Sequence, residues 1–514
     1  MSDVSANNKR IAKNTLVLYV RMLFLMGIGL YTSRVILYAL GVEDFGVYNV
    51  VGGFVALFAV LSKSMSSAAT RFLNFEMGRG HQEKLKNVFS TILIIHVALV
   101  VIIAFLLELI GVWFVNNKMV IPEDRLYAAN WVFQLSLLTF CLNLIIVPYN
   151  AAIIAHEKMS AFAYISVFEG VGKLLIAYLV MVSPMDKLIL YAILMFLIQF
   201  VVRTMYQIYC KRHFSECVFH FVIDKPLLKE IFGYATWNMI GTSSAILRNQ
   251  GGNVLINVFC GPVVNAARAV ANQVLHAVDG FVNNFVIALK PQITKSYASG
   301  EWDYMMSLIY QGSRLSYYML LFLSLPILVN TDYLLHLWLK EVPDHSVPFV
   351  QLTLMFSMAE SISHPLVTAQ LATGKIRNYQ LVVGGLQMMN LPVSYILLRL
   401  GGAPETILFV AIFFSLCCLA ARLYMLRSMI NLNATHFLYK VIINVVVVTF
   451  LSSLIPLYIN SILTISFQTF LLVSLSCIVS SVISIMYVGC NQKERSLVYS
   501  KVLDVIRRKY GKLF

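Results

Sequence analysis

Apolar residues in this chain are grouped into long blocks that are separated by short polar segments. A helix needs about 20 predominantly apolar residues to cross the hydrocarbon of a bilayer, and the blocks reach that length repeatedly. The pattern therefore predicts an all-α polytopic membrane protein with about fourteen transmembrane helices. They are expected at 14–40, 45–72, 87–115, 125–153, 160–182, 187–209, 231–259, 263–289, 306–330, 346–371, 379–398, 405–426, 437–459 and 462–489.

The composition agrees with this pattern. Of the 514 residues, 59% are hydrophobic and only 12% are charged, which is typical of a polytopic membrane protein and excludes a soluble enzyme. The formal net charge of +15 would suggest a nucleic-acid partner in a soluble protein, but no soluble module is left to bind one. The stretch "CKRHFSECVFH" lacks the close Cys and His spacing of a zinc site, and no disulfide framework or nucleotide-binding loop is expected.

Basic residues are distributed unevenly between the two sets of loops. Of the 39 Lys and Arg residues, 24 fall in loops and tails on the side of the N-terminus, and five fall in loops on the other side. The positive-inside rule therefore predicts that both termini are cytoplasmic. The tail "KERSLVYSKVLDVIRRKYGKLF" is basic and amphipathic, and both binding to anionic lipid and simple solvation are compatible with it.

Two landmarks recur at an offset of 220 residues. The turn "YALGVEDFGVYNVV" at Gly41 matches "NVFCGPVVNAARAV" at Gly261, and "EMGRGHQEKL" with Gly80 matches "SYASGEWDYM" with Gly300. Six helices, an even number, separate the copies, so both halves cross the membrane in the same direction. This predicts two pseudo-symmetric six-helix lobes with a transport site between them. The expected divisions are lobes at 1–210 and 230–430, a linker at 211–229, two extra helices at 431–489 and a basic tail at 490–514.

Ten basic residues fall within the predicted spans, where an unpaired charge costs about 3 kcal/mol on an insertion scale unless it faces a cavity or a partner. Some lie near inner helix ends, where the side chain is expected to snorkel to the interface: Arg71, Arg203, Arg422 and, as a weaker case, Arg314. Lys173 follows Glu169 by four residues, so an ion pair is expected there. The five that remain are Arg21, Arg34, Lys63, Arg248 and Arg268.

These five cations lie on the first two helices of each repeat, and the second repeat also carries a polar stripe. Its members recur at steps of three and four and cover an arc of about 80°: Asn265, Arg268, Asn272, His276, Asp279 and Asn283. The preceding helix adds Gln250, Asn253 and Asn257. Such a stripe lines a water-filled cavity or joins packed helices. The cavity is expected to bind substrate through Arg21, Arg34, Lys63, Arg248, Arg268, Asn253, Asn257, Asn272 and Asn283.

With these features the chain resembles the Wzx-type polysaccharide and O-antigen flippases of the multidrug/oligosaccharidyl-lipid/polysaccharide (MOP) exporter superfamily. The likeness covers nearly the whole chain and is carried by "TSRVILYALGVEDFGVYNVV", "SSAATRFLNFEMGRG", "NQGGNVLINVFCGPVVNAARAVANQV" and "KPQITKSYASGE". It implies a MATE-like fold, alternating access and a place in the bacterial inner membrane. It also implies a polyprenyl-diphosphate-linked oligosaccharide as substrate, no cofactor, and a polysaccharide polymerase and chain-length proteins as possible partners.

The charges favour a flippase over an exporter of cationic drugs. A diphosphate needs Arg or Lys donors, whereas a cationic drug needs carboxylates, and cations outnumber acids in the spans. An inside-negative potential favours outward movement of an anion by about 2.3 kcal/mol per charge per 100 mV, so coupling to Na⁺ or H⁺ is optional. Asp279 and Glu108 are the candidate coupling residues, although a structural pair or hydrogen bond is the favoured role for each. A cation-coupled multidrug exporter, a lipid II-type flippase and a polymerase or ligase remain alternatives.

Overall fold

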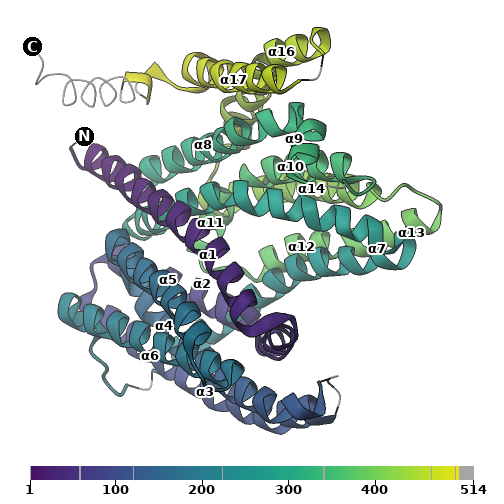
Figure 1. Cartoon of the computed structure of the whole chain (residues 1–514). Coiled ribbons are helices and arrows are strands. Elements are labelled where there is room, and N and C mark those ends of the chain that lie inside the picture. Colours follow the sequence, from purple (N-terminus) through teal and green to yellow (C-terminus); the bar gives the residue numbers. More distant parts are fainter. Residues whose placement is uncertain are drawn as a thin grey trace, which may run out of the picture. The chain divides into compact units, whose positions relative to one another are not determined.

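The computed structural model describes residues 2–496, apart from 57–58, 118, 120, 223, 340–341, 465 and 493. Every regular element in this part of the chain is a helix (Figure 1). The α-helices are α1 Ser2–Ala56, α2 Ala59–Arg79, α3 Gln82–Asn117, α4 Leu126–Ala155, α5 Met159–Val182, α6 Lys187–His213, α7 Lys225–Ser299, α8 Trp302–Val329, α9 Thr331–Trp338, α10 Ser346–Ser361, α11 His364–Ala372, α12 Arg377–Met388, α13 Asn390–Arg399, α14 Thr406–Ile430, α15 Ala434–Phe437, α16 Asn444–Ile462 and α17 Phe467–Ser484.

Ten helices of the described chain are long and apolar enough to cross a membrane. They are Arg10–Gly41, Gln82–Asn117, Glu123–Ala155, Met159–Val182, Lys187–His213, Trp302–Val329, Arg377–Arg399, Thr406–Ile430, Ala434–Ile462 and Phe467–Gly489. The predicted all-α, multi-pass architecture is confirmed, whereas the count of fourteen stays a prediction. One expected span, 346–371, is divided between α10 and α11, because the helix is interrupted after Ser361.

The chain divides into two compact units. Unit 1 consists of Met1–Ser243, Ile287–Met305 and Leu371–Leu381, and unit 2 consists of Ser244–Val286, Met306–Gln370 and Val382–Phe514. The core of unit 1 is built around α4. The candidate membrane span that contains α4 is 67% buried, whereas the span formed by α3 is only 33% buried. Phe133 and Leu144 of α4 are fully buried in one apolar cluster with Val51, Leu107 and Leu188. The lobe bounds expected from the repeat remain predictions.

The structure supports both predicted helix hairpins, the first by its backbone angles and the second by a side-chain contact. Within α1, Gly41 has φ 80° and ψ 170°, so the helix is broken at the glycine where the sequence predicts a turn. Within α7, the Arg268 guanidinium donates to the backbone carbonyl of Asn249 at 3.3 Å. A straight helix would separate these residues by about 28 Å. The chain must therefore fold back between residues 249 and 268, a stretch that contains the turn predicted at Gly261.

The second pair of landmarks, Gly80 and Gly300, has the same local structure. Both glycines are left-handed, with φ 72° and φ 77°. Gly80 N–H donates to the carbonyl of residue 77 at 3.2 Å, and Gly300 N–H donates to that of residue 297 at 3.4 Å. The next N–H in each copy donates to the carbonyl five residues before it, as in a Schellman motif. The two predicted landmarks therefore share one helix-capping geometry, and the repeat itself stays a prediction.

Glu157 lies in the turn between α4 and α5 and joins this turn to two helices of unit 1, α1 and α7. Its side chain is 1% exposed and accepts hydrogen bonds from Lys295 Nζ at 2.7 Å, Arg10 Nε at 2.9 Å and Gln292 Nε2 at 2.8 Å. Its carbonyl accepts a further bond from Asn14 Nδ2 at 3.2 Å. Burial alone would raise the pKa of Glu157, but these charges and hydrogen bonds together hold it below its ordinary value.

The Glu157→Gln variant is expected to lose on the order of 3 kcal/mol of stability at pH 7, because it leaves the half-buried Lys295 without a counter-charge. Since the pKa of Glu157 is lowered on folding, the ionised carboxylate stabilises the fold above the ordinary value of 4.5. This contribution disappears as the pH falls through the lowered pKa. Thermal unfolding of the full-length protein across pH 3–7 measures it. A stability difference that does not change with pH would contradict the assignment, and Glu83→Gln, whose carboxylate is 86% exposed, is the control.

Replacing Gly80 or Gly300 with Ala is expected to cost about 1 kcal/mol each, because both need a left-handed backbone that a Cβ disfavours. Gly233→Ala is the matched control. Gly233 lies inside α7, and a Cβ there would meet nothing within 4 Å, so the change should be neutral or slightly stabilising. Thermal unfolding in detergent compares the three, and equal effects would contradict the special role of the two caps.

Candidate functional site

Four charged side chains gather inside unit 2, on three helices. Arg248 and Arg268 come from α7, Glu360 from α10 and Arg422 from α14. Glu360 interacts electrostatically with both Arg422 and Arg248, and Arg248 repels Arg268. Three positive charges and one negative charge give the cluster a net charge of +2. We call these four residues the cation cluster.

Arg268 is the most deeply placed of the predicted substrate-binding cations, with 7% of its surface exposed. One terminal nitrogen, Nη2, donates to the Asn249 carbonyl at 3.3 Å. The other, Nη1, is buried and has no hydrogen-bond partner within the described part of the chain. A Cβ on Gly252 would lie 2.8 Å from both nitrogens, so the guanidinium packs directly on a position that only glycine leaves open. Arg268 therefore keeps an unsatisfied donor in a dry environment.

The other members of the cluster are held by neighbouring side chains. The Arg248 guanidinium lies over the Phe356 ring, 4.7 Å from its centroid. Glu360 accepts a hydrogen bond from Ser415 Oγ at 2.8 Å. Arg422 is only 3% exposed. Because Glu360 is shared between two guanidinium groups, it cannot neutralise the cluster.

Asp279, a candidate coupling residue, lies close to this cluster. It accepts a hydrogen bond from Ser357 Oγ, and it interacts electrostatically with His276 and Glu360. If Asp279 is ionised, the net charge of the cluster and its surroundings falls to +1. Ionisation of Asp279 therefore lowers the positive charge that the cluster offers to a ligand.

This arrangement is suited to binding an anion. Buried like charges repel each other, and a guanidinium removed from water needs an oxygen for each of its N–H groups. A phosphate group supplies several acceptor oxygens and negative charge at once, and Arg binds it with a planar fork of donors. A cationic ligand would gain little from a site in which three of four charges are positive.

The predicted cations of unit 1 are less enclosed. Arg21 is half-buried, lies 4.5 Å from the centroid of the Phe162 ring and is attracted by Glu169. Arg34 and Lys63 are exposed, and neither forms an ion pair with the residues that the structure describes. Three cations of the predicted set are thus without a carboxylate partner in the described chain, namely Arg34, Lys63 and Arg268.

The predicted amides differ in exposure. Asn253 and Asn272 are half-buried, Asn283 is exposed, and the side chain of Asn257 lies outside the described part of the protein. Glu108, the other candidate coupling residue, is exposed and accepts a hydrogen bond from Gln134 Nε2 at 3.0 Å.

Two expectations about structural charges have opposite outcomes. The ion pair between Lys173 and Glu169 is confirmed, with Nζ 2.6 Å from Oε1. Snorkelling is wrong for three arginines, Arg71, Arg314 and Arg422, which are between 3% and 7% exposed. Protein atoms cover them instead of the interface, and Arg314, for example, pairs with Glu494 at 2.9 Å. Glu360, an acid within a predicted span, was a sequence signal that a cation lies near it, but not of which cation.

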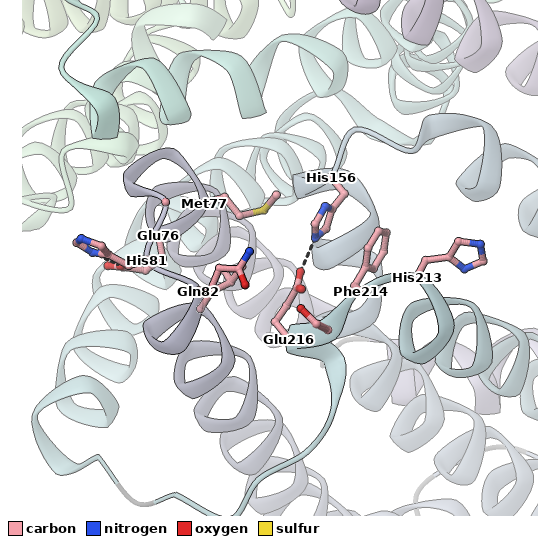
Figure 2. A pocket seen from close by; sticks show the side chains of 11 residues that line it. Glu76, Met77, His81, Gln82, His156, His213, Phe214 and Glu216 are labelled. Atoms are coloured by element: carbon pink, nitrogen blue, oxygen red, sulfur yellow. Dashed lines mark hydrogen bonds and ion pairs between the residues drawn. The ribbon is translucent and has the colours of Figure 1, made fainter.

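A hollow of about 270 Å³ in unit 1 involves the expected linker at 211–229. Figure 2 shows Glu216 and His156 pointing toward one another, and the two form an ion pair. The His156 ring stacks on Phe214 with centroids 3.9 Å apart. Burial alone would raise the pKa of Glu216, but its bond to His156 holds the pKa below the usual range. The contacts fasten the linker to the end of α4. Within the described residues, no three metal-ligating side chains come together.

Comparison with known proteins shows which class this fold and site define. A family model described as "Polysaccharide biosynthesis protein" matches residues 11–297. This is more than half of the chain. The protein is a membrane transporter of the MOP superfamily. In particular, it belongs to the polysaccharide biosynthesis protein family, a flippase family of that superfamily. Comparison with curated proteins gives no match.

Solved structures of MATE transporters share the fold. An outward-facing MATE transporter of the MOP superfamily is 12% identical, with a TM-score of 0.72 over 83% of this chain and 96% of that chain. The bent form of a Vibrio cholerae MATE transporter is 16% identical, with a TM-score of 0.70 over 86% and 100%. A MOP transporter from Pyrococcus furiosus, described as having a binding pocket of reversed polarity, is 12% identical, with a TM-score of 0.68 over 82% and 96%. At these identities the likeness shows the fold alone.

The Gly252→Ala variant tests the close packing at Arg268. The added Cβ must displace the guanidinium, and such overpacking typically costs about 1–3 kcal/mol. In an Arg268→Ala background the clash is gone, so the same change should cost almost nothing. A double-mutant cycle of unfolding free energies measures this coupling. Additive effects would contradict the contact, and Gly233→Ala serves again as the control.

Proposed function

We propose that this protein is a flippase for a polyprenyl-diphosphate-linked oligosaccharide, such as an O-antigen or another repeat unit of a surface polysaccharide. It moves this lipid from the inner to the outer leaflet of a bacterial inner membrane by alternating access, with both termini in the cytoplasm. The observation that carries the proposal is Arg268, a buried guanidinium beside Arg248 with one donor left unsatisfied in the described chain.

The charge of the cation cluster supports a diphosphate as the bound group. A diphosphate diester carries about two negative charges, which matches a cluster of three arginines and one glutamate. Transient neutralisation by the substrate would offset the cost of burying these arginines. The family supports the glycan part of the substrate, because its members act in polysaccharide biosynthesis. A polysaccharide polymerase and chain-length proteins are proposed as partners on the same grounds.

The energy source in this proposal is the membrane potential, with coupling to Na⁺ or H⁺ as an addition and no resident cofactor. Asp279 is the better-placed coupling residue, because its protonation changes the charge beside the cluster. Glu108 is exposed and bonded to Gln134, and it remains the second choice. A proton bound at Asp279 would strengthen anion binding, and its release would weaken it.

A cation-coupled multidrug exporter is the second candidate. It is favoured by one observation, the approach of Asp279 to Glu360 in unit 2, which could hold a cation if the arginines moved away. Drug sensitivity of a deletion strain with intact surface glycan would favour it. A lipid II-type flippase shares the diphosphate chemistry and differs only in the sugar. The lipid-linked intermediate that accumulates in a deletion strain distinguishes it.

The Arg268→Ala and Arg248→Ala variants are expected to reduce surface glycan at least tenfold, because each removes charge-assisted hydrogen bonds to the diphosphate. Arg268→Lys keeps the charge without the planar fork, so it should retain intermediate activity. Surface glycan in a complemented deletion strain, normalised to the amount of protein in the membrane, measures this. The control is Arg427→Ala, an exposed arginine on α14. Normal glycan display by both alanine variants would refute the proposed site.

A further inference from the structure

A cationic hollow lies in unit 1, where α2 ends and α3 and α7 begin. Its volume is about 450 Å³, and it shares no residue with the cation cluster of unit 2. The residues that matter among those lining it are Arg71, Phe75, Arg79, Lys84, Asp224 and Glu230. The positive-inside rule predicts that this side of the membrane is cytoplasmic.

Arg71 is the buried element of this hollow. Its side chain is 8% exposed, and its guanidinium lies 4.4 Å and 4.6 Å from the ring centroids of Phe72 and Phe75. A Cβ on Gly374 would lie 2.3 Å from Nη2, so this glycine, with φ 76°, covers one edge of the guanidinium. The nearest carboxylate, Glu230, is 3.7 Å from Nη1, and Nε has no hydrogen-bond partner in the described chain. Arg71 is therefore desolvated but incompletely paired.

Two further cations stand at the same hollow without carboxylates of their own. The Arg79 guanidinium lies 4.4 Å from the Phe75 centroid, so two guanidinium groups share one ring. In the described chain, neither Arg79 nor Lys84 forms an ion pair. The hollow also borders the first turns of α3 and α7, whose free N–H groups and dipoles favour an anion.

The acids at the hollow do not satisfy these cations. Asp224 caps α7, because its carboxylate accepts the Leu227 N–H at 3.0 Å. Glu76 lies 3.5 Å from His81 Nδ1, and it also attracts Arg71 more weakly than Glu230 does. Glu230 is the remaining acid, and its side chain is 63% exposed, so it can turn into water. A ligand with negative oxygens could replace Glu230 beside Arg71 without leaving a buried carboxylate unpaired.

We propose that this hollow binds a diphosphate group on the side of the membrane from which the lipid-linked substrate is taken. Its three cations supply donors to the phosphate oxygens, and Glu230 is the resident counter-charge that the ligand displaces. The site would hold the diphosphate before it enters the transport path. The site would recognise a free diphosphate by the same chemistry, so diphosphate binding does not rest on the proposed function. Only the identity of the ligand as a lipid-linked diphosphate rests on it.

The test is a binding experiment with the full-length protein in neutral detergent. Arg268→Ala is used as the background, so that the cation cluster of unit 2 does not contribute to binding. The probes are farnesyl diphosphate and inorganic pyrophosphate, titrated by calorimetry at low salt. The variants are Arg79→Gln and Lys84→Gln, which alter exposed side chains and leave the fold intact. Lys86→Gln is the matched control, because Lys86 pairs with Glu83 at 3.1 Å and does not line the hollow.

Arg79→Gln and Lys84→Gln are each expected to weaken binding of farnesyl diphosphate roughly tenfold, with Lys86→Gln unchanged. Glu230→Gln is expected to tighten binding severalfold, an effect that a purely structural role would not produce. Comparable affinity for pyrophosphate would show that the diphosphate alone suffices, and higher affinity for farnesyl diphosphate would point to the lipid-linked source.

Unchanged binding in Arg79→Gln and Lys84→Gln would overturn the proposed diphosphate site, even if the alanine variants of the cation cluster abolish glycan display. Equally strong competition by phosphatidylglycerol, which carries a single phosphodiester, would also overturn it. Conversely, the Arg248→Ala and Arg268→Ala variants could display glycan normally while farnesyl diphosphate binds the hollow as expected. This result would refute the transport site in unit 2 and support the diphosphate site in unit 1.

Discussion

The structure depends on how arginine is accommodated away from water. A guanidinium in an apolar environment is stable only when its charge and its five N–H groups are met by partners. At Arg314 an acid and a backbone carbonyl meet both terminal nitrogens, and only Nε lacks a hydrogen-bond partner in the described chain. At Arg268 only one backbone carbonyl does so within the described chain, at 3.3 Å. The difference between these two arginines separates structural charge from charge that is kept available for a ligand.

Glycine allows buried guanidinium groups to pack directly against the backbone. The Arg268 guanidinium rests on Gly252, and the Arg71 guanidinium rests on Gly374, in each case where a Cβ would clash. The left-handed caps at Gly80 and Gly300 end two helices in the same way, which gives the repeat a physical basis. Glycines thus set both the helix ends of the repeat and the space in which cations lie beside backbone.

Much of the fold could be predicted from the sequence, because long apolar blocks and left-handed glycines are local signals. The breaks at Gly41, Gly80 and Gly300 follow from such signals. The approach of Glu360 to Arg422 does not, because it depends on how α10 packs against α14. Nor could burial of Arg71 be predicted, because this residue lies near a helix end. A distant segment helps to cover it: the centroid of the Tyr234 ring lies 5.7 Å from the Arg71 guanidinium. The 3.7 Å distance between Arg71 Nη1 and the Glu230 carboxylate likewise depends on how the helices pack.

The central claim is that the cation cluster of unit 2 receives a diphosphate. Modification by an arginine-selective dicarbonyl reagent, mapped residue by residue by mass spectrometry, tests it most directly on the full-length protein. The account predicts that farnesyl diphosphate slows modification of Arg248 and Arg268 severalfold, while exposed Arg427 reacts at the same rate with and without it. Equal rates at Arg248 and Arg268 in the presence and absence of saturating diphosphate would contradict the claim.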